Sequence, residues 1–115
     1  MRAVSRSENP ELQFIFAQND EMGIGAAAAV TAAGLVPGTD VKIATIDGTT
    51  PALEALAAGD LSFVAQYNPF FGDLAVEAVN DALAGDTVEK VIVVPGETFD
   101  SAEAGQAAID AGKGF

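Results

Sequence analysis

The sequence contains no cysteine and no histidine, and these two absences exclude much of the usual chemistry of enzyme sites. A chain without thiols or imidazoles forms no disulfide and offers neither a cysteine nucleophile nor a histidine general base. The same absences remove the ligands that zinc sites generally use. We therefore expect no catalytic residue and no metal site of the usual kind, and we assign no cofactor.

Basic residues are also scarce, with 5 Lys and Arg against 17 Asp and Glu and a formal net charge of −12. Without a cluster of cations to neutralise phosphates, we expect no nucleic-acid partner and no docking on anionic lipid. The longest apolar runs have the length of strands, which argues against a transmembrane helix. Residues 1–11 form a polar tail without an apolar stretch, so we expect no signal peptide in this chain.

Four short runs rich in apolar, β-branched or aromatic residues predict strands at 13–17, 41–46, 62–65 and 90–94. The first and last runs are almost continuously apolar, as in strands that are buried on both faces of a parallel sheet. The chain is long enough for one domain with a single core.

Helical patterns separate these strands. The first covers residues 20–33 and closes at Gly34, a residue type that favours the end of a helix. In the second, Thr50 can cap the helix, Pro51 suits the first turn and Gly59 ends it.

The third helical pattern is the clearest, because one stripe is apolar, the opposite face is acidic and Gly85 follows. We expect the stripe to be buried; it consists of Phe71, Leu74, Ala75, Ala78, Val79, Ala82 and Leu83. A fourth, weaker helix begins where Asp100 and Glu103 match the spacing of a capping box, and it ends at Gly112.

Alternating strands and helices predict an α/β fold, a small parallel β-sheet of βαβ units flanked by helices, of the flavodoxin-like or Rossmann-like kind. We expect helices on both sides of the sheet. Residues 1–115 should form a single partial α/β lobe, with a turn and a short helix over 96–115.

Polar side chains close three of the predicted strands. Residues 18–20 (Gln-Asn-Asp) follow the first, Asp47 and Gly48 follow the second, and residues 66–68 (Gln-Tyr-Asn) follow the third. In an open parallel sheet, ligands bind beyond the carboxyl ends of the strands. No cation or phosphate-binding glycine loop lies at these ends, and "GIGAAAA" (23–29) falls within a helix pattern.

Amides and carboxylates without cations suit a neutral, polyhydroxylated ligand, because a carboxylate accepts hydrogen bonds from neighbouring hydroxyls and an amide both donates and accepts. Aromatic rings often cover the apolar face of such a ligand. Tyr67, Phe70 and Phe71 are candidates, although they also fit the core. Structural explanations stay open for Asp20 as a helix cap and for Asp47 as a turn residue. Gln66 has no such explanation.

The same residues carry a resemblance. The stretches "IFAQNDEMGIGAAAAVTAAGL", "VKIATIDGTTPALEALAAGDLSFVAQYNP" and "AVEAVNDALAG", between residues 12 and 85, resemble the C-terminal lobe of type I, ribose-binding-protein-like periplasmic sugar-binding proteins of bacterial ABC importers. "NPFFG" and the tail are similar to the subgroup that binds simple sugars, including galactofuranose-type ligands.

The resemblance implies that Asn19, Asp47 and Gln66 hydrogen-bond the hydroxyls of a monosaccharide, with Asp20 and Asn68 as weaker candidates. It also implies a non-enzymatic protein of two hinged lobes, periplasmic or lipid-anchored outside the cell, whose closure on sugar is recognised by an ABC permease.

Compared with the family pattern, the N-terminal lobe and the first strand–helix units of the C-terminal lobe are missing. The first strand is then an exposed edge, and we expect it to favour pairing with a second copy. Two alternatives share the fold. One is the effector-binding core of a lac-repressor-like regulator, which "IDG" and the lack of a helix-turn-helix disfavour. The other is a small flavodoxin-like or receiver-type enzyme or switch, which would need an acidic pair at the end of the first strand and a Lys near the last, and "KVIVVPGE" has no Lys after its strand.

Overall fold

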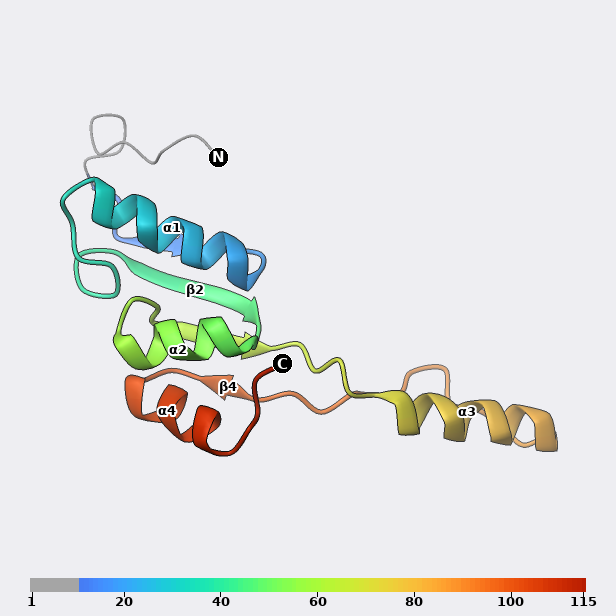
Figure 1. The fold of residues 1–115 in the computed structure, drawn as a ribbon. Coiled ribbons are helices and arrows are strands. Elements are labelled where there is room, and N and C mark those ends of the chain that lie inside the picture. Colours follow the sequence, from blue (N-terminus) through green and yellow to red (C-terminus); the bar gives the residue numbers. More distant parts are fainter. Residues whose placement is uncertain (1–10) are drawn as a thin grey trace.

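The computed structural model describes residues 11–115, and its main body is a small sheet with helices packed on it (Figure 1). The polar tail expected at residues 1–11 lies, except for Glu11, outside the described residues. Along the chain the elements are β1 (Phe14–Phe16), α1 (Asp20–Ala32), β2 (Lys42–Asp47), α2 (Thr50–Ala58), β3 (Phe63–Gln66), α3 (Gly72–Ala84), β4 (Thr98–Phe99) and α4 (Ala102–Asp110). No helix among them is long and apolar enough to cross a membrane.

The predicted α/β fold is confirmed, with strands in the order β1-β2-β3-β4. The first three strands are parallel, and β4 runs antiparallel to β3. The expected strand at 90–94 is wrong: these residues belong to no strand of the described chain, and the fourth strand is the two-residue β4 instead. The β-branched residues at 90–94 have the right propensity, but in residues 11–115 they pair with none of the four strands of the sheet.

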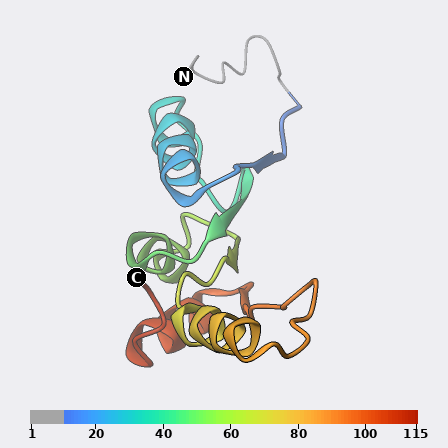
Figure 2. The same cartoon turned by 90° about the vertical axis from the view of Figure 1, so that its right-hand side faces the viewer.

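The helices of the main body, α1, α2 and α4, all lie on one face of the sheet, which corrects the expectation of helices on both faces (Figure 2). The strand order explains this arrangement. Because β1, β2 and β3 follow one another in a single direction across the sheet, crossovers of the same hand all fall on the same side.

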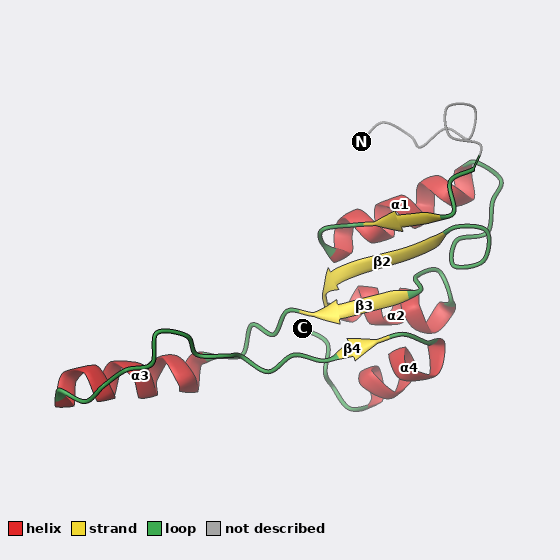
Figure 3. Cartoon of the chain, turned by 180° about the vertical axis from the view of Figure 1, so that it is seen from behind, coloured by secondary structure: helices red, strands yellow, loops and turns green. Residues whose placement is uncertain are grey.

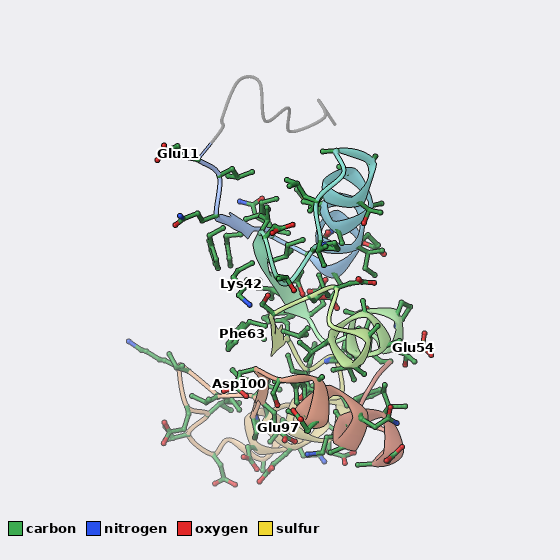
Figure 4. All side chains as sticks on the ribbon, turned by 90° about the vertical axis from the view of Figure 1, so that its left-hand side faces the viewer. Glu11, Lys42, Glu54, Phe63, Glu97 and Asp100 are labelled. Carbon is green, nitrogen blue, oxygen red and sulfur yellow. The ribbon has the colours of Figure 1, made fainter. Side chains whose placement is uncertain are left out.

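The opposite face of the sheet carries large side chains without a covering layer. Lys42 and Phe63 point away from the helices (Figure 4), and Phe14 and Phe16, whose strand pairs with β2 beside them, are 56% and 59% exposed. β1 is also an edge strand, with one neighbour among the described residues. Pairing of this edge with a second copy stays a prediction.

The core lies between the sheet and its three helices. It is built from aliphatic side chains of β2, β3, α1, α2 and α4, together with Phe99 and with Val41 and Leu61, which precede β2 and β3. Its largest fully buried apolar members are Val41, Ile43, Leu53, Leu56 and Val64. Small residues allow close approach: Gly105 of α4 faces backbone atoms of α2, and a Cβ there would lie 3.0 Å from the Ala57 nitrogen. Burial of these side chains stabilises the lobe through the hydrophobic effect.

Helix α3 and the segment that returns from it, residues 86–95, project from the main body as an arm (Figures 1 and 3). No residue of α3 is buried, so the expectation that its apolar stripe belongs to the core is wrong. Val79 is 57% exposed and Leu83 is 82% exposed. The stripe correctly predicted the helix, but periodicity does not tell which surface covers it.

The caps of the helices differ by one residue from those expected. Asn19, not Asp20, caps α1, because its extended backbone lets the side chain accept from the Met22 amide. Ser101, not Asp100, caps α4 in the same way. Thr49 holds the N-cap position of α2 and Gly59 ends that helix in the left-handed conformation.

Candidate sugar-binding edge

The polar ends of β1, β2 and β3 meet at one edge of the sheet, as predicted from their sequence. Asp47 and Gln66 are register partners in the neighbouring parallel strands β2 and β3. The Tyr67 amide donates to the Asp47 carbonyl at 2.7 Å and ties these two strand ends together. Asn19 lies beyond the end of β1, where the chain enters α1. The structure therefore brings Asn19, Asp47 and Gln66 to the same edge.

Asn19 is half-buried, and one of the two polar groups of its side chain makes a hydrogen bond within the protein. Its Oδ1 accepts from the Met22 amide at 2.9 Å and so caps α1. Within residues 11–115 its Nδ2 group donates to no protein atom. A ligand at this edge would meet Asn19 as a hydrogen-bond donor.

Asp47 has an unusual backbone. Its φ of 139° makes it the one residue besides glycine with a positive φ in the part of the chain that the structure describes. Such a conformation costs of order 1–3 kcal/mol and persists where surrounding contacts impose it, often at functional sites. The half-buried carboxylate accepts no hydrogen bond from residues 11–115. Its acceptor oxygens are therefore available to a ligand.

Gln66 is held firmly at the end of β3. Its backbone amide donates to the Glu97 carbonyl at 2.8 Å, and its Nε2 donates to the Lys113 carbonyl at 3.1 Å. Gly48 packs against it so closely that a Cβ at Gly48 would lie 3.0 Å from the Gln66 Cγ. With Nε2 engaged, Gln66 would meet a ligand through Oε1, as an acceptor.

The two weaker candidates have their polar atoms bonded within the protein. Asp20 is completely buried, and both its carboxylate oxygens accept hydrogen bonds from β2 and the loop after it. Asn68 donates from Nδ2 to the Pro95 carbonyl and accepts at Oδ1 from the Phe70 amide. Asn68 thus joins the two chain segments that lead into and out of the arm.

A hollow opens beside this edge, at the base of the arm. Its lining includes Gln66 and Asn68, followed by Tyr67, Phe71, Ile92, Val94 and Gly96. Tyr67 is 72% exposed and Phe70 is 71% exposed, so the interpretation of the aromatic cluster as core is wrong for the described chain. Tyr67 lies in the hollow beside Gln66, where its ring can face a ligand.

The C-terminal residues 113–115 also lie at this edge, and no sequence signal pointed to them. The Thr50 amide donates to the Phe115 carbonyl at 3.1 Å, and the ring of Phe115 packs edge-on against Phe70 with centroids 6.2 Å apart. Lys113 forms an ion pair with Glu97 at 2.6 Å. These contacts depend on tertiary structure, and a motif search has no means to find them.

The family of the chain follows from comparisons with known proteins. A family model described as a periplasmic binding protein domain matches residues 1–87. The chain belongs to this family of periplasmic binding proteins.

The curated relatives that the chain resembles are import binding proteins for sugars. The chain is 60% identical over 102 residues to the fructose import binding protein FruE of Bifidobacterium longum. This match covers 89% of the chain and 30% of FruE. It is 39% identical over 88 residues to the ribose import binding protein RbsB of Bacillus subtilis. This match covers 76% of the chain and 28% of RbsB. The chain thus spans about a third of the length of these relatives. Their names disfavour the alternative of a transcription regulator's core.

Solved structures agree with the fold. A Mycobacterium smegmatis protein in complex with β-D-fucofuranose superposes with a TM-score of 0.82 at 38% identity, covering 93% of this chain and 35% of that one. The arabinose-transporter binding protein of Shewanella sp. ANA-3, bound to L-arabinofuranose, superposes with a TM-score of 0.82 at 31% identity. This match covers 92% of this chain and 35% of that one. The resemblance seen in the sequence is therefore confirmed.

Proposed function

We propose that this chain contributes one wall of a monosaccharide-binding cleft, formed by Asn19, Asp47 and Gln66. The observation that carries the proposal is the pairing of Asp47 with Gln66 at the carboxyl edge of a parallel sheet. The named relatives, which import or bind fructose, ribose or furanose sugars, support a pentose or hexose as ligand.

The hydrogen-bonding groups at the edge are complementary in type. The Asp47 carboxylate can accept from two neighbouring hydroxyls, the Gln66 Oε1 can accept from a third, and the Asn19 amide can donate to a hydroxyl or ring oxygen. Hydrogen bonds to a charged group are the stronger ones, so Asp47 should contribute most of the affinity. Nothing in this arrangement requires a bond to be broken, so we assign binding without catalysis.

The second wall of the cleft would come from the rest of a longer protein, and the exposed apolar side chains of the arm support this part of the proposal. The apolar stripe of α3 and residues 91–93, which are 43–78% exposed, would be unfavourable in water if nothing covered them. Relatives about three times as long contain enough chain to supply that cover. We extend the proposal to a periplasmic import protein that delivers its sugar to an ABC permease.

Weak but measurable sugar binding is the expected behaviour of a single wall. Ligand-observed NMR of this chain with ribose, fructose, galactose and arabinose should give saturation transfer for one or more of them. Half a cleft should bind in the millimolar range, on the order of −4 kcal/mol. Absence of a signal for every sugar at roughly 50 mM, which is more than ten times that dissociation constant, would contradict binding by this chain.

A further inference from the structure

We propose that Asp20 is a positioning residue, which holds Asp47 in the conformation that the sugar site needs; this proposal rests on the proposed function. Asp20 begins α1, yet its side chain is completely buried and points to the neighbouring strand end rather than to solvent. A buried carboxylate is costly unless several donors compensate it. The donors that do so here belong to β2 and to the loop that follows Asp47.

Four hydrogen bonds reach the Asp20 carboxylate. Oδ1 accepts from the Thr45 hydroxyl at 2.7 Å. Oδ2 accepts from the Gly48 amide at 2.9 Å, the Thr49 amide at 2.7 Å and the Thr49 hydroxyl at 2.8 Å. Asp20 therefore binds the chain on both sides of Asp47, at Thr45 before it and at Gly48 and Thr49 after it.

The backbone of Asp47 needs such a restraint. Asp47 and Gly48 have φ values of 139° and 91°, so the chain leaves β2 through two consecutive residues with positive φ before α2 begins at Thr50. Only the glycine adopts this region without strain. On the β3 side, the Tyr67 amide holds the Asp47 carbonyl. On the α1 side, Asp20 holds the two following amides, and together these bonds offset the strain at Asp47.

Asp20 also sets the distance between two ligand groups. It directly follows Asn19, whose side chain caps the same helix, so one rigid helix start carries both Asn19 and the anchor of the Asp47 loop. A change at Asp20 should therefore act on sugar binding through Asp47, without any contact between Asp20 and the sugar. A site held in place before the ligand arrives avoids the ordering cost on binding.

The test compares wild type with Asp20→Asn, which keeps the size of the side chain but removes its charge and replaces an acceptor oxygen with a donor group. Sugar affinity should fall about tenfold, because charge-assisted hydrogen bonds to the loop are lost. The three-bond coupling between the amide and α protons of residue 47, which is small at a φ of 139° and large in an extended strand, should rise. Asp60→Asn, an exposed carboxylate after α2, should change neither quantity.

A double substitution separates positioning from general loss of structure. If Asp20 acts through Asp47, then adding Asp20→Asn to Asp47→Asn, which keeps the side-chain size and part of the affinity, should weaken sugar binding by less than about twofold. Thr45→Val, which removes one donor to Asp20 and keeps the shape, serves if Asp20→Asn does not fold; it should raise the coupling at residue 47 and weaken binding about threefold.

The outcomes distinguish this proposal from the proposed function. Unchanged coupling at residue 47 in folded Asp20→Asn or Thr45→Val would overturn the positioning role, whether or not the chain binds sugar. Sugar binding that survives undiminished in these variants would overturn it as well. A changed coupling in a chain that binds no sugar at all would support the positioning of Asp47 and contradict the proposed function alone.

Discussion

Replacing Gly23 with alanine is expected to lower the free energy of unfolding by about 2–3 kcal/mol, because the new methyl group has no space. Gly23 is buried in α1, and a Cβ there would fall well inside van der Waals contact with the Thr45 methyl group. Thr45 cannot easily turn away, since it is completely buried and its hydroxyl donates to Asp20. Urea unfolding followed by circular dichroism measures the change.

Gly25 provides the matched control, two residues further along the same helix. Apart from its chain neighbours and the backbone of its own helix, no described atom lies within 4 Å of the position that its Cβ would take. Alanine at Gly25 should therefore raise the free energy of unfolding by about 0.5–1 kcal/mol, through helix propensity alone. Equal stability of the two variants would show that α1 does not pack against β2 as the structure has it.

Replacing Asp47 with alanine is expected to weaken sugar binding about 100-fold, which for a single wall means loss of a detectable signal, because two charge-assisted hydrogen bonds disappear together. The variant should not be less stable than wild type, since the Asp47 carboxylate makes no hydrogen bond within residues 11–115 and alanine keeps the Cβ that strains the positive φ. Ligand-observed NMR and urea unfolding on the same samples separate binding from stability.

Asp47→Gly and Asp60→Ala are the controls for that result. Glycine relieves the positive φ and should raise the free energy of unfolding by about 1 kcal/mol while abolishing sugar binding. Asp60 is exposed after α2, so Asp60→Ala removes the same charge without changing the sugar-binding edge. This variant should bind sugar as wild type does. Normal affinity in Asp47→Gly would show that the carboxylate takes no part in binding.

The parts of the fold that the sequence predicted are those with strong local signals. β1, β2 and β3 follow from short apolar runs, and α2 follows from Pro51 near its start and Gly59 at its end. The convergence of Asp47 and Gln66 was predictable as well, because parallel strands bring their carboxyl ends to the same edge. These conclusions need only residue types and their order.

The errors arise where several placements are equally consistent with the local chemistry. Asn19 and Asp20 are adjacent and both cap helices well, so only the structure shows that Asn19 caps α1 while Asp20 bonds to the β2–α2 loop. The run at 90–94 has strand propensity but finds no partner strand among the described residues. Likewise, the stripe of α3 is amphipathic whether it faces this lobe or another surface.

The central claim, that a monosaccharide binds at the edge formed by β1, β2 and β3, is tested most directly by nitrogen-15 NMR titration of the whole chain. The sugar with the strongest ligand-observed signal should shift the backbone amides around Asn19, Asp47 and Gln66, and also the side-chain NH2 signals of Asn19 and Gln66. Signals at the opposite edge, around Lys42 at the start of β2 and Asp60 before β3, should not move. Shifts confined to that opposite edge, or no shifts at saturating sugar, would contradict the account.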